Sequence, residues 1–199
     1  ALENTHRLDA AYVRTLVVRT KAGPDVLASA DRPTTTPVDP LRVKTLIDFA
    51  SRHYRYTVLD IPRSDAGVLD SLEACRTIAV IVNQELPTVR AAGRLVTILR
   101  RRYGKDKVNV VISRADRKSE LSIEDLERVV GGPADAVVPS DYRLALQALN
   151  HGRPVVLDGK SPLAASFQAY ARDLAGLTGE DRSADRSAGL FGRLTGRRS

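Results

Sequence analysis

The stretch TIAVIVNQELPTVRAAGRLVTILRRRYGKDKVNVVISR, residues 77–114, decides the fold. Its first seven and its last eight residues are predominantly apolar runs in which hydrophobic and polar residues do not alternate. Strands of this kind are typical of a sheet covered by helices on both faces. Between the two runs, Pro87 marks the start of a helix that we expect to extend to about Arg102. A strand, a helix and a second strand in this order predict part of a parallel sheet.

The rest of the chain repeats this alternation. Further strands are predicted for PDVLAS (the strand from Asp25 to Ser29), YTVLDIP and ADAVVPSD, and PVVLDG is predicted to be a short extended run. Helices are predicted for LDAAYVRTLVVRT, for Pro40 to about His53 behind the cap Asp39, for AGVLDSLEAC, for SIEDLERVV behind the cap Ser122, for DYRLALQALNHG up to Gly152, and behind Ser161 and Pro162. The fold class is therefore α/β, with a mostly parallel, doubly wound sheet and helices on both faces, over residues 1–176. Residues 177–199 are predicted to be a disordered basic tail.

The composition is that of an ordinary globular protein. Of its 199 residues, 43% are hydrophobic and 28% charged, and the length suffices for one domain with a sizeable core. No run approaches the ~20 apolar residues that a membrane span needs. The single cysteine, Cys75, cannot form an internal disulfide, which favours a reducing compartment and a cytoplasmic location. The three histidines are too scattered along the sequence for a metal site.

The net charge of +7 is concentrated in two places. Between Arg90 and Lys107 there are seven Lys/Arg residues and one acid, Asp106. Such a stretch is either the solvated end of a helix or a patch for acidic partners such as nucleic acid or anionic lipid. The second place is the end of the tail, GLFGRLTGRRS, where Leu190, Phe191 and Leu194 lie among arginines. This segment either touches an anionic membrane surface, giving a peripheral location at the inner membrane, or is a floppy tail.

Ligands of open α/β sheets bind at the carboxyl ends of the strands. This rule places a row of polar residues along one edge of the predicted sheet: Asp60, Asn83, Arg114, Ser140 and Asp141. Asp60 ends the predicted strand YTVLDIP, and a carboxylate there suits Mg²⁺ held through water, although strand-end aspartates are also common caps. Arg63 either pairs on the surface with Asp65 or Asp70, or lies near phosphate or a dimer partner.

Other catalytic motifs are absent from the sequence. It contains no G-x-x-x-x-G-K-[ST] phosphate loop, no G-x-S-x-G and no H-E-x-x-H. The nearest phosphate-loop candidate, RTKAGPD at residues 19–25, has one glycine and leads into a predicted strand, so residues 21–24 are predicted to be a turn. The sequence therefore contains a candidate Mg²⁺-binding residue of a nucleotide site, Asp60, and lacks the loop that would bind the phosphates.

The run YTVLDIPRSDAGVLDSLEACRTIAVIVNQELPTVRAAGRLVTILR resembles the region from switch II onward in the MinD/ParA family of P-loop ATPases. Its turn with Glu85, Pro87, Thr88 and Arg90 is similar to a turn in that family. The segments SRADRKSELS and PSDYRLALQALNHGRPV look most like the CpaE/TadZ branch, which acts in pilus assembly. The resemblance covers about residues 8–174, the C-terminal portion of such a domain.

The resemblance implies a set of nucleotide-binding residues: Asp60, Pro62, Arg63, Ser113, Arg114, Pro139 and Asp141. Asp60 would act on Mg²⁺ through water. Ser113 and Arg114 match an Asn-Arg pair beside adenine, and residues 139–141 match the segment that closes over the base. Ser113 departs from the family, because a hydroxyl cannot make the bidentate contact of an amide. The phosphate loop, expected in the missing N-terminal third, is also absent, so we expect this chain alone to bind and hydrolyse ATP poorly.

Three functions follow as expectations. The first is a pilus-assembly protein that uses ATP and Mg²⁺ in its full-length form as a dimerisation switch, with a second copy or secretion machinery as partner. The second is a scaffold that keeps the fold and has lost nucleotide binding, for which Ser113 is the supporting feature. The third is a ParA-type DNA partition protein that would use the basic stretch between Arg90 and Lys107.

Overall fold

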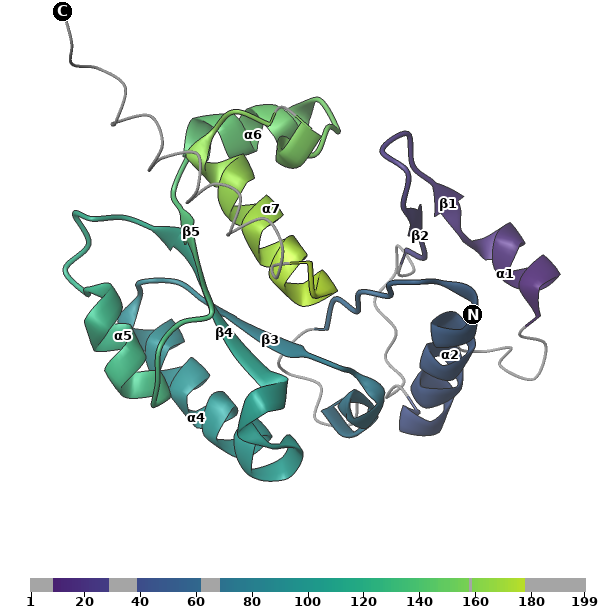
Figure 1. Ribbon diagram of the computed structural model, residues 1–199, viewed down its shortest axis with the longest axis horizontal. Coiled ribbons are helices and arrows are strands. Elements are labelled where there is room, and N and C mark those ends of the chain that lie inside the picture. The colour runs from purple at the N-terminus through teal and green to yellow at the C-terminus, as the bar shows by residue number, and fades with distance from the viewer. Residues whose placement is uncertain (1–8, 29–38, 62–68, 158, 178–199) are drawn as a thin grey trace, which may run out of the picture. The chain divides into compact units, whose positions relative to one another are not determined.

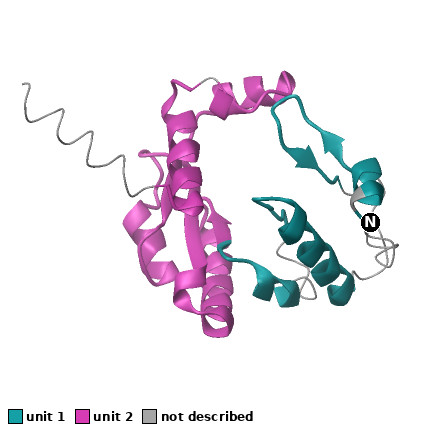
Figure 2. Ribbon diagram, turned by 45° about the vertical axis from the view of Figure 1, so that its right-hand side comes forward, with its two compact units in different colours: residues 1–78 teal, residues 79–199 magenta. Residues whose placement is uncertain are grey.

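The computed structural model describes residues 9–28, 39–61, 69–157 and 159–177 (Figure 1). The chain divides into two compact units, residues 1–78 and 79–199, which Figure 2 shows in different colours. No helix in the described ranges is long and apolar enough to cross a membrane. The two units are described separately below.

The C-terminal unit contains the parallel sheet that the sequence predicts. Its strands are β3 (Ile78–Val82), which begins at the boundary of the units, β4 (Val108–Ala115) and β5 (Ala136–Pro139), in the spatial order β3-β4-β5. Its helices are α4 (Leu86–Tyr103), α5 (Ile123–Val130), α6 (Tyr142–Asn150) and α7 (Pro162–Ala175), with 3-10 turns η3 (Lys105–Lys107) and η4 (Val155–Leu157). The predicted α/β alternation is confirmed over this unit.

Helices cover both faces of this sheet. On one side α4 and α5 pack against each other and against β4. Three side chains of these elements, Val96, Ile112 and Leu126, are fully buried. On the other side Val111 and Val138 pack against Leu163 of α7. β3 departs from the prediction of a strand buried on both faces, because Ile78, Val80 and Val82 are buried while Ala79 and Ile81 are exposed.

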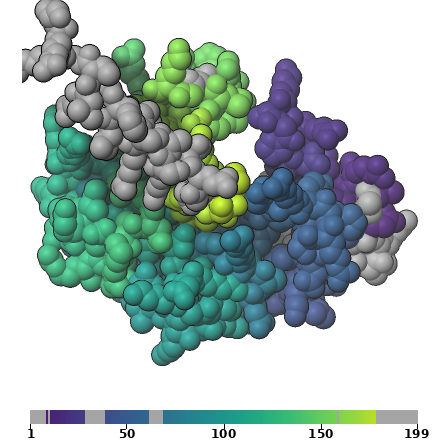
Figure 3. All heavy atoms as spheres, viewed as in Figure 1, coloured from purple at the N-terminus to yellow at the C-terminus, as the bar shows by residue number. Residues whose placement is uncertain are grey.

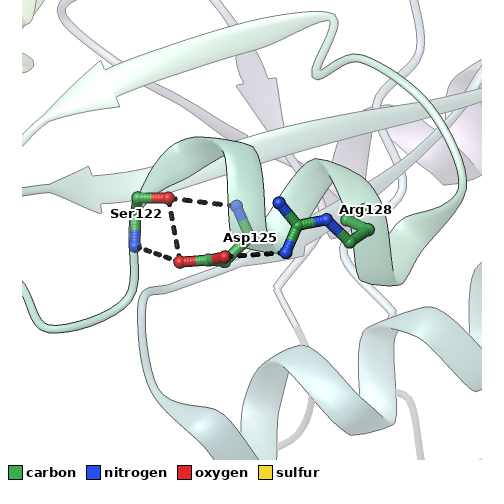
Figure 4. A network of polar contacts seen from close by, with 3 residues as sticks. All are labelled: Ser122, Asp125 and Arg128. Atoms are coloured by element: carbon green, nitrogen blue, oxygen red, sulfur yellow. Dashed lines mark hydrogen bonds and ion pairs between the residues drawn. The ribbon is translucent and has the colours of Figure 1, made fainter.

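The helix ends follow from local sequence. Ser122 caps α5 through a capping box: its hydroxyl accepts from the Asp125 amide at 3.1 Å, and its own amide donates to the Asp125 carboxylate at 3.2 Å (Figure 4). Arg128 completes the network with an ion pair to Asp125 at 3.1 Å. The hydrogen bonds from Ser122 lower the pKa of the Asp125 carboxyl. Ser161 caps α7 through a single hydrogen bond, in which its hydroxyl accepts from the Ala164 amide at 3.0 Å.

The N-terminal unit is built differently. Its elements are α1 (Ala10–Leu16), the antiparallel hairpin of β1 (Val18–Arg19) and β2 (Asp25–Val26), α2 (Pro40–His53) and the 3-10 helix η2 (Asp70–Ala74). Asp39 caps α2 and Pro40 opens it, as predicted. η2 packs against α2, and the Ser71 hydroxyl donates to the Pro40 carbonyl at 3.3 Å.

Several predictions for this unit are wrong. The helix predicted for LDAAYVRTLVVRT ends at Leu16, where β1 of the hairpin follows after one residue. The strand predicted for PDVLAS contributes only β2 of this antiparallel hairpin, so it is not part of the parallel sheet; the turn predicted at residues 21–24 is confirmed and connects β1 to β2. The start of the helix predicted over AGVLDSLEAC, residues 66–68, lies outside the described residues; Leu69 is helical and the 3-10 helix η2 follows it. In the C-terminal unit, residues 155–157 of the predicted extended run PVVLDG form the 3-10 turn η4 instead.

The most consequential error concerns residues 56–60, which form no strand. Val58 is 91% exposed and Tyr56 is 58% exposed. A strand must give its backbone N–H and C=O groups to a neighbour, and the only described sheet within this unit is the two-stranded hairpin β1-β2. An apolar run with no adjacent strand therefore stays extended and unpaired, although its composition is that of a buried strand.

Candidate functional site

The strongest site feature of the C-terminal unit is an irregularity in β4. Ile112 pairs with Val137, yet Ala115 pairs with Pro139, so β4 carries one residue more than β5 over this interval. The extra residue makes a β-bulge at Ser113 and Arg114. Bulges occur next to binding sites because they bend the strand and redirect its side chains. The bulge falls on the two residues that the family resemblance pointed to.

Arg114 is the one described residue other than glycine with a positive φ, at 54°. This left-handed conformation costs a residue with a Cβ atom about 1 kcal/mol or more, and such strain collects at functional sites. The Ser140 amide, which donates to the Ala115 carbonyl at 2.9 Å, ties the end of β5 to the strand just beyond the bulge. The strained arginine is therefore held at the carboxyl end of two parallel strands, where ligands of open sheets bind.

A pocket of about 660 Å³ opens beside the bulge, and we call it the base pocket because the family resemblance implies a nucleotide base at these residues. Four of the predicted site residues line it: Ser113, Arg114, Pro139 and Asp141. The remaining wall comes from α6, the loop after it and α7, the yellow-green end of the described chain in Figure 3. The wall is mostly apolar and includes Leu146, Leu149, Leu163 and Phe167. An apolar pocket with a few polar groups at one side is the form of a small-molecule site, and its volume exceeds that of a purine ring.

Asp141 has a structural task inside this pocket. Its carboxylate oxygen Oδ1 accepts from the Leu144 amide at 3.0 Å and thereby caps α6. One oxygen of the carboxylate is therefore used to fix the helix, and Oδ2 is the oxygen that could meet a ligand. The cap sets the direction in which α6 leaves β5, and α6 in turn supplies the apolar wall.

Sequence reasoning missed the aromatic member of the pocket. Tyr142, the first residue of α6, lines the pocket and is 76% exposed. A large exposed aromatic side chain beside a polar pocket mouth is suited to stacking on a planar ring. The sequence contained a signal for this role, because Tyr142 directly follows Asp141. The first residue of a helix that is capped at the end of a strand lies at the same edge of the sheet as the cap.

Gln84 is the second residue that sequence reasoning missed. Its amide nitrogen donates to the Leu121 carbonyl at 2.6 Å, and its amide oxygen accepts from the Asp116 amide at 2.7 Å. These two bonds join the loop after β3 to the loop after β4. The neighbouring Asn83 has a buried oxygen, Oδ1, without a hydrogen-bond partner in the described part of the chain. The carboxyl edge of β3 is thus pinned to that of β4.

The residue that was predicted to bind Mg²⁺ belongs to the N-terminal unit. Asp60 is exposed at the end of the unpaired run 56–60, so it does not terminate a strand as predicted. Pro62 and Arg63 lie outside the described residues, as does Asp65. The described ranges contain no group of three or more His, Cys, Asp or Glu residues that could hold a metal. A single exposed carboxylate cannot coordinate a magnesium ion alone. It can hold one whose other ligands are water molecules and phosphate oxygens.

No family model matches the chain. It is 27% identical to the septum site-determining protein MinD of Thermotoga maritima over 146 residues, which are 70% of this chain and 54% of that protein. It is 21% identical to MinD of Bacillus subtilis over 147 residues, 71% of this chain and 54% of that protein. The chain spans about half the length of the curated relatives it matches.

Solved structures give the same result. A ParA-family ATPase from Chlorobium tepidum superposes with a TM-score of 0.74 at 25% identity, covering 85% of this chain and 72% of that one. MinD in the MinC:MinD complex of Aquifex aeolicus superposes with a TM-score of 0.70 at 23% identity, over 88% and 70% of the two chains. MinD of Pyrococcus horikoshii, solved with Mg-ADP, has a TM-score of 0.60 at 18% identity, over 71% and 59%. The chain is homologous to MinD/ParA-family P-loop ATPases.

Proposed function

We propose that this homologue of the MinD/ParA ATPases contributes the base-binding part of a nucleotide switch. The observation that carries the proposal is the bulge of β4, which holds Arg114 in a left-handed conformation at the mouth of the base pocket. Strained, redirected residues at the carboxyl end of parallel strands have little structural benefit of their own, since a regular strand would cost less free energy. A purine base between the apolar wall and Tyr142 would use them.

The residues divide the task by chemistry. Leu146 and Phe167 supply apolar surface for the faces of the base, and Tyr142 supplies a ring for stacking. Ser113 offers one hydroxyl, which can donate or accept a single hydrogen bond, so recognition of the base edge is expected to be weak. Arg114 brings a fixed positive charge to the mouth, where the phosphates of a nucleotide would add negative charge.

The metal part of the proposal concerns Asp60, Pro62 and Arg63. Mg²⁺, when bound with ATP, neutralises phosphate charge and orients the terminal phosphate. Asp60 is the residue that would hold it, through water, and Pro62 and Arg63 would follow the state of the phosphate. The sequence contains no phosphate-loop motif, so hydrolysis by this chain alone is not part of the proposal.

The cellular role that we propose is pilus assembly or the positioning of secretion machinery. It rests on the segments SRADRKSELS and PSDYRLALQALNHGRPV, which look most like the CpaE/TadZ branch. Partners would be a second copy or proteins of that machinery, in the cytoplasm or at the inner membrane. Deleting the gene in its host should abolish pili, and restoring the wild-type gene should return them. Normal piliation of the deletion strain would contradict this role.

The base pocket can be tested with a ligand that needs no phosphate loop. We expect adenosine to bind the full chain with a Kd of about 1 mM or weaker, measured by titration calorimetry or ligand-observed NMR. Tyr142→Ala should weaken binding by about fivefold or more, since stacking on an aromatic ring contributes roughly 1–3 kcal/mol. Tyr56→Ala, at an exposed tyrosine of the other unit, is the matched control and should leave the Kd unchanged. No saturable binding of adenosine or of ATP with Mg²⁺ at ~10 mM would favour the scaffold.

A further inference from the structure

The exposed face of α4 carries a row of arginines that is independent of the base pocket. Arg90, Arg94 and Arg101 are separated by four and seven residues, so at 100° per residue they fall within a 40° arc of the helix. All three side chains are exposed. Ile98 lies beside them on the same face and is 49% exposed. We call this face the arginine stripe.

Three of the other four cations of the same basic stretch are engaged within the protein, and the fourth, Lys105, follows the end of α4. The Arg100 guanidinium donates to the Val130 carbonyl at 2.8 Å and to the Gly131 carbonyl at 3.2 Å, at the end of α5. Arg102 and Lys107 lie over the ring of Tyr103, with 5.3 Å and 5.5 Å to its centroid. Arg90, Arg94 and Arg101, by contrast, form no ion pair or hydrogen bond through their side chains among the described residues. Their positive charge faces outward uncompensated.

A groove runs along the stripe where α4 crosses α5. Gly93 makes this crossing close, because a Cβ atom there would lie 2.9 Å from the Val129 carbonyl oxygen. The groove has a volume of about 510 Å³ and is lined by Arg90, Gly93, Arg94, Thr97, Ile98 and Val129. Val129 is 49% exposed, so the groove has an apolar floor from two helices and a basic rim from one.

Of the three acids of α5, Glu124, Asp125 and Glu127, only Asp125 has the i, i+4 spacing that puts it on the same face as Val129, and it does not neutralise this rim. Asp125 lies one turn before Val129, and its carboxylate is engaged by the Ser122 amide and hydroxyl and by Arg128. These bonds hold Asp125 in its own network at the start of α5 (Figure 4). The field of the groove is therefore set by the three free arginines of α4.

Three kinds of occupant can be compared. A second copy of this chain is disfavoured, because the chain carries a net charge of +7 and would bring like charges together. Nucleic acid would satisfy the arginines, yet its phosphate backbone leaves Ile98 and Val129 uncovered, and such interfaces are polar. An amphipathic helix with apolar residues on one face and acids along its edge satisfies both the floor and the rim.

We propose that the arginine stripe and the groove beside it bind an acidic amphipathic helix of a partner protein. Apolar side chains at spacings i, i+3, i+4 and i+7 would cover Ile98 and Val129, and flanking carboxylates would meet Arg90, Arg94 and Arg101. Arginine is suited to this pairing because its planar guanidinium meets a carboxylate with two parallel hydrogen bonds.

The test uses a defined probe. A fluorescein-labelled 16-residue peptide of Leu, Ala and Glu places leucines at the helical spacing above and glutamates beside them; a second peptide scrambles the same composition. Fluorescence anisotropy with the full chain should show the patterned peptide binding at least about tenfold more tightly than the scrambled one. Arg90→Glu/Arg94→Glu should weaken it by about tenfold or more, because like charges would then meet. Arg76→Glu/Arg172→Glu, which changes net charge equally at exposed sites elsewhere, should not.

The apolar floor has its own control. Ile98→Ala should weaken the patterned peptide by about threefold or more, while Leu41→Ala, at a 70% exposed leucine of α2, should not. Circular dichroism establishes that all variants are folded. Equal binding of the patterned and scrambled peptides would overturn the proposal. So would a 20-bp DNA duplex that binds more tightly than the patterned peptide and is unaffected by Ile98→Ala, since the stripe would then be a phosphate-binding surface. Adenosine affinity is unaffected in either case, so this test and that of the base pocket are separate.

Discussion

The two units of this protein contain similar apolar runs and use them in opposite ways. In the C-terminal unit, Val82 and Ile112 of β3 and β4 are 1% and 0% exposed. In the N-terminal unit, Val58 sits in an equally apolar run and is 91% exposed. The two C-terminal runs pair as strands, and helices cover both faces of β4; the run at residues 56–60 has no strand pairing. An apolar composition is therefore not sufficient for a buried strand, which also requires a neighbouring strand to pair with.

The largest predicted effect separates the two units by stability. Ile112→Ala should lower the free energy of unfolding by about 2–5 kcal/mol, because it empties volume in a core that packs α4 and α5 against β4. Val58→Ala should change it by less than about 0.5 kcal/mol, because the side chain is already in water. Chemical denaturation followed by circular dichroism measures both. Equal losses in the two variants would show that residues 56–60 are packed in solution and would remove the contrast between the units.

A smaller effect is expected where the C-terminal unit is most tightly packed. Gly93→Ala should cost about 1–3 kcal/mol, because the added methyl group meets the Val129 carbonyl oxygen at 2.9 Å and forces α4 and α5 apart. Ala91→Ser, two residues earlier on the same helix, is the control, because it also adds one heavy atom to a small side chain. The midpoint of denaturation should fall for the first variant and stay close to the wild type for the second. A Gly93→Ala protein as stable as the wild type would mean that the crossing of the two helices adjusts freely.

The cap of α5 should contribute less again. Ser122→Ala should cost about 0.5–2 kcal/mol, because it leaves the Asp125 amide without its acceptor. Ser166→Ala is the comparison, since that hydroxyl only donates to the Leu163 carbonyl at 2.8 Å within its own helix. Thermal melts of the two variants should differ in this order. A reversed order would contradict the assignment of the capping box as a determinant of this unit.

The smallest effect is a dependence on pH. Hydrogen bonds from Ser122 lower the pKa of the folded Asp125 carboxyl below its value in the unfolded chain, so its contribution to stability is present at neutral pH. The contribution is lost as the pH falls from about 4 through the lower folded pKa. The stability difference between the wild type and Asp125→Asn should therefore shrink as the solution is acidified. A difference that stays constant down to about pH 2 would contradict the lowered pKa.

The sequence predicted the C-terminal unit well because its signals there are local and complete. Ser122 and Ser161 mark helix starts by their own hydrogen bonds. The strands β3, β4 and β5 pair with one another in one sheet. The strand predicted at residues 56–60 was wrong because the hydrophobic period and composition of a segment do not indicate whether another strand lies next to it. PVVLDG failed for a related reason, since a short apolar run does not distinguish an extended segment from the 3-10 turn η4.

The candidate site was predicted in part. Ser113, Arg114, Pro139 and Asp141 line one pocket, as expected for residues at the carboxyl ends of parallel strands. The bulge in β4 could not be predicted, because it depends on a register difference between two strands that are distant in sequence. Only the folded chain shows that α6 and α7 form the apolar wall. The signal for Tyr142 was present in the sequence, directly after a helix cap.

The central claim, that the C-terminal unit alone binds the base of a nucleotide, is tested most directly by NMR of the ¹⁵N-labelled full chain. On titration with adenosine, the amide signals of Ser113, Arg114, Ser140 and Tyr142 should shift together along one binding curve, and those of α2 in the N-terminal unit should stay in place. Shifts confined to residues outside the base pocket, or no shifts at ~10 mM adenosine, would contradict the account.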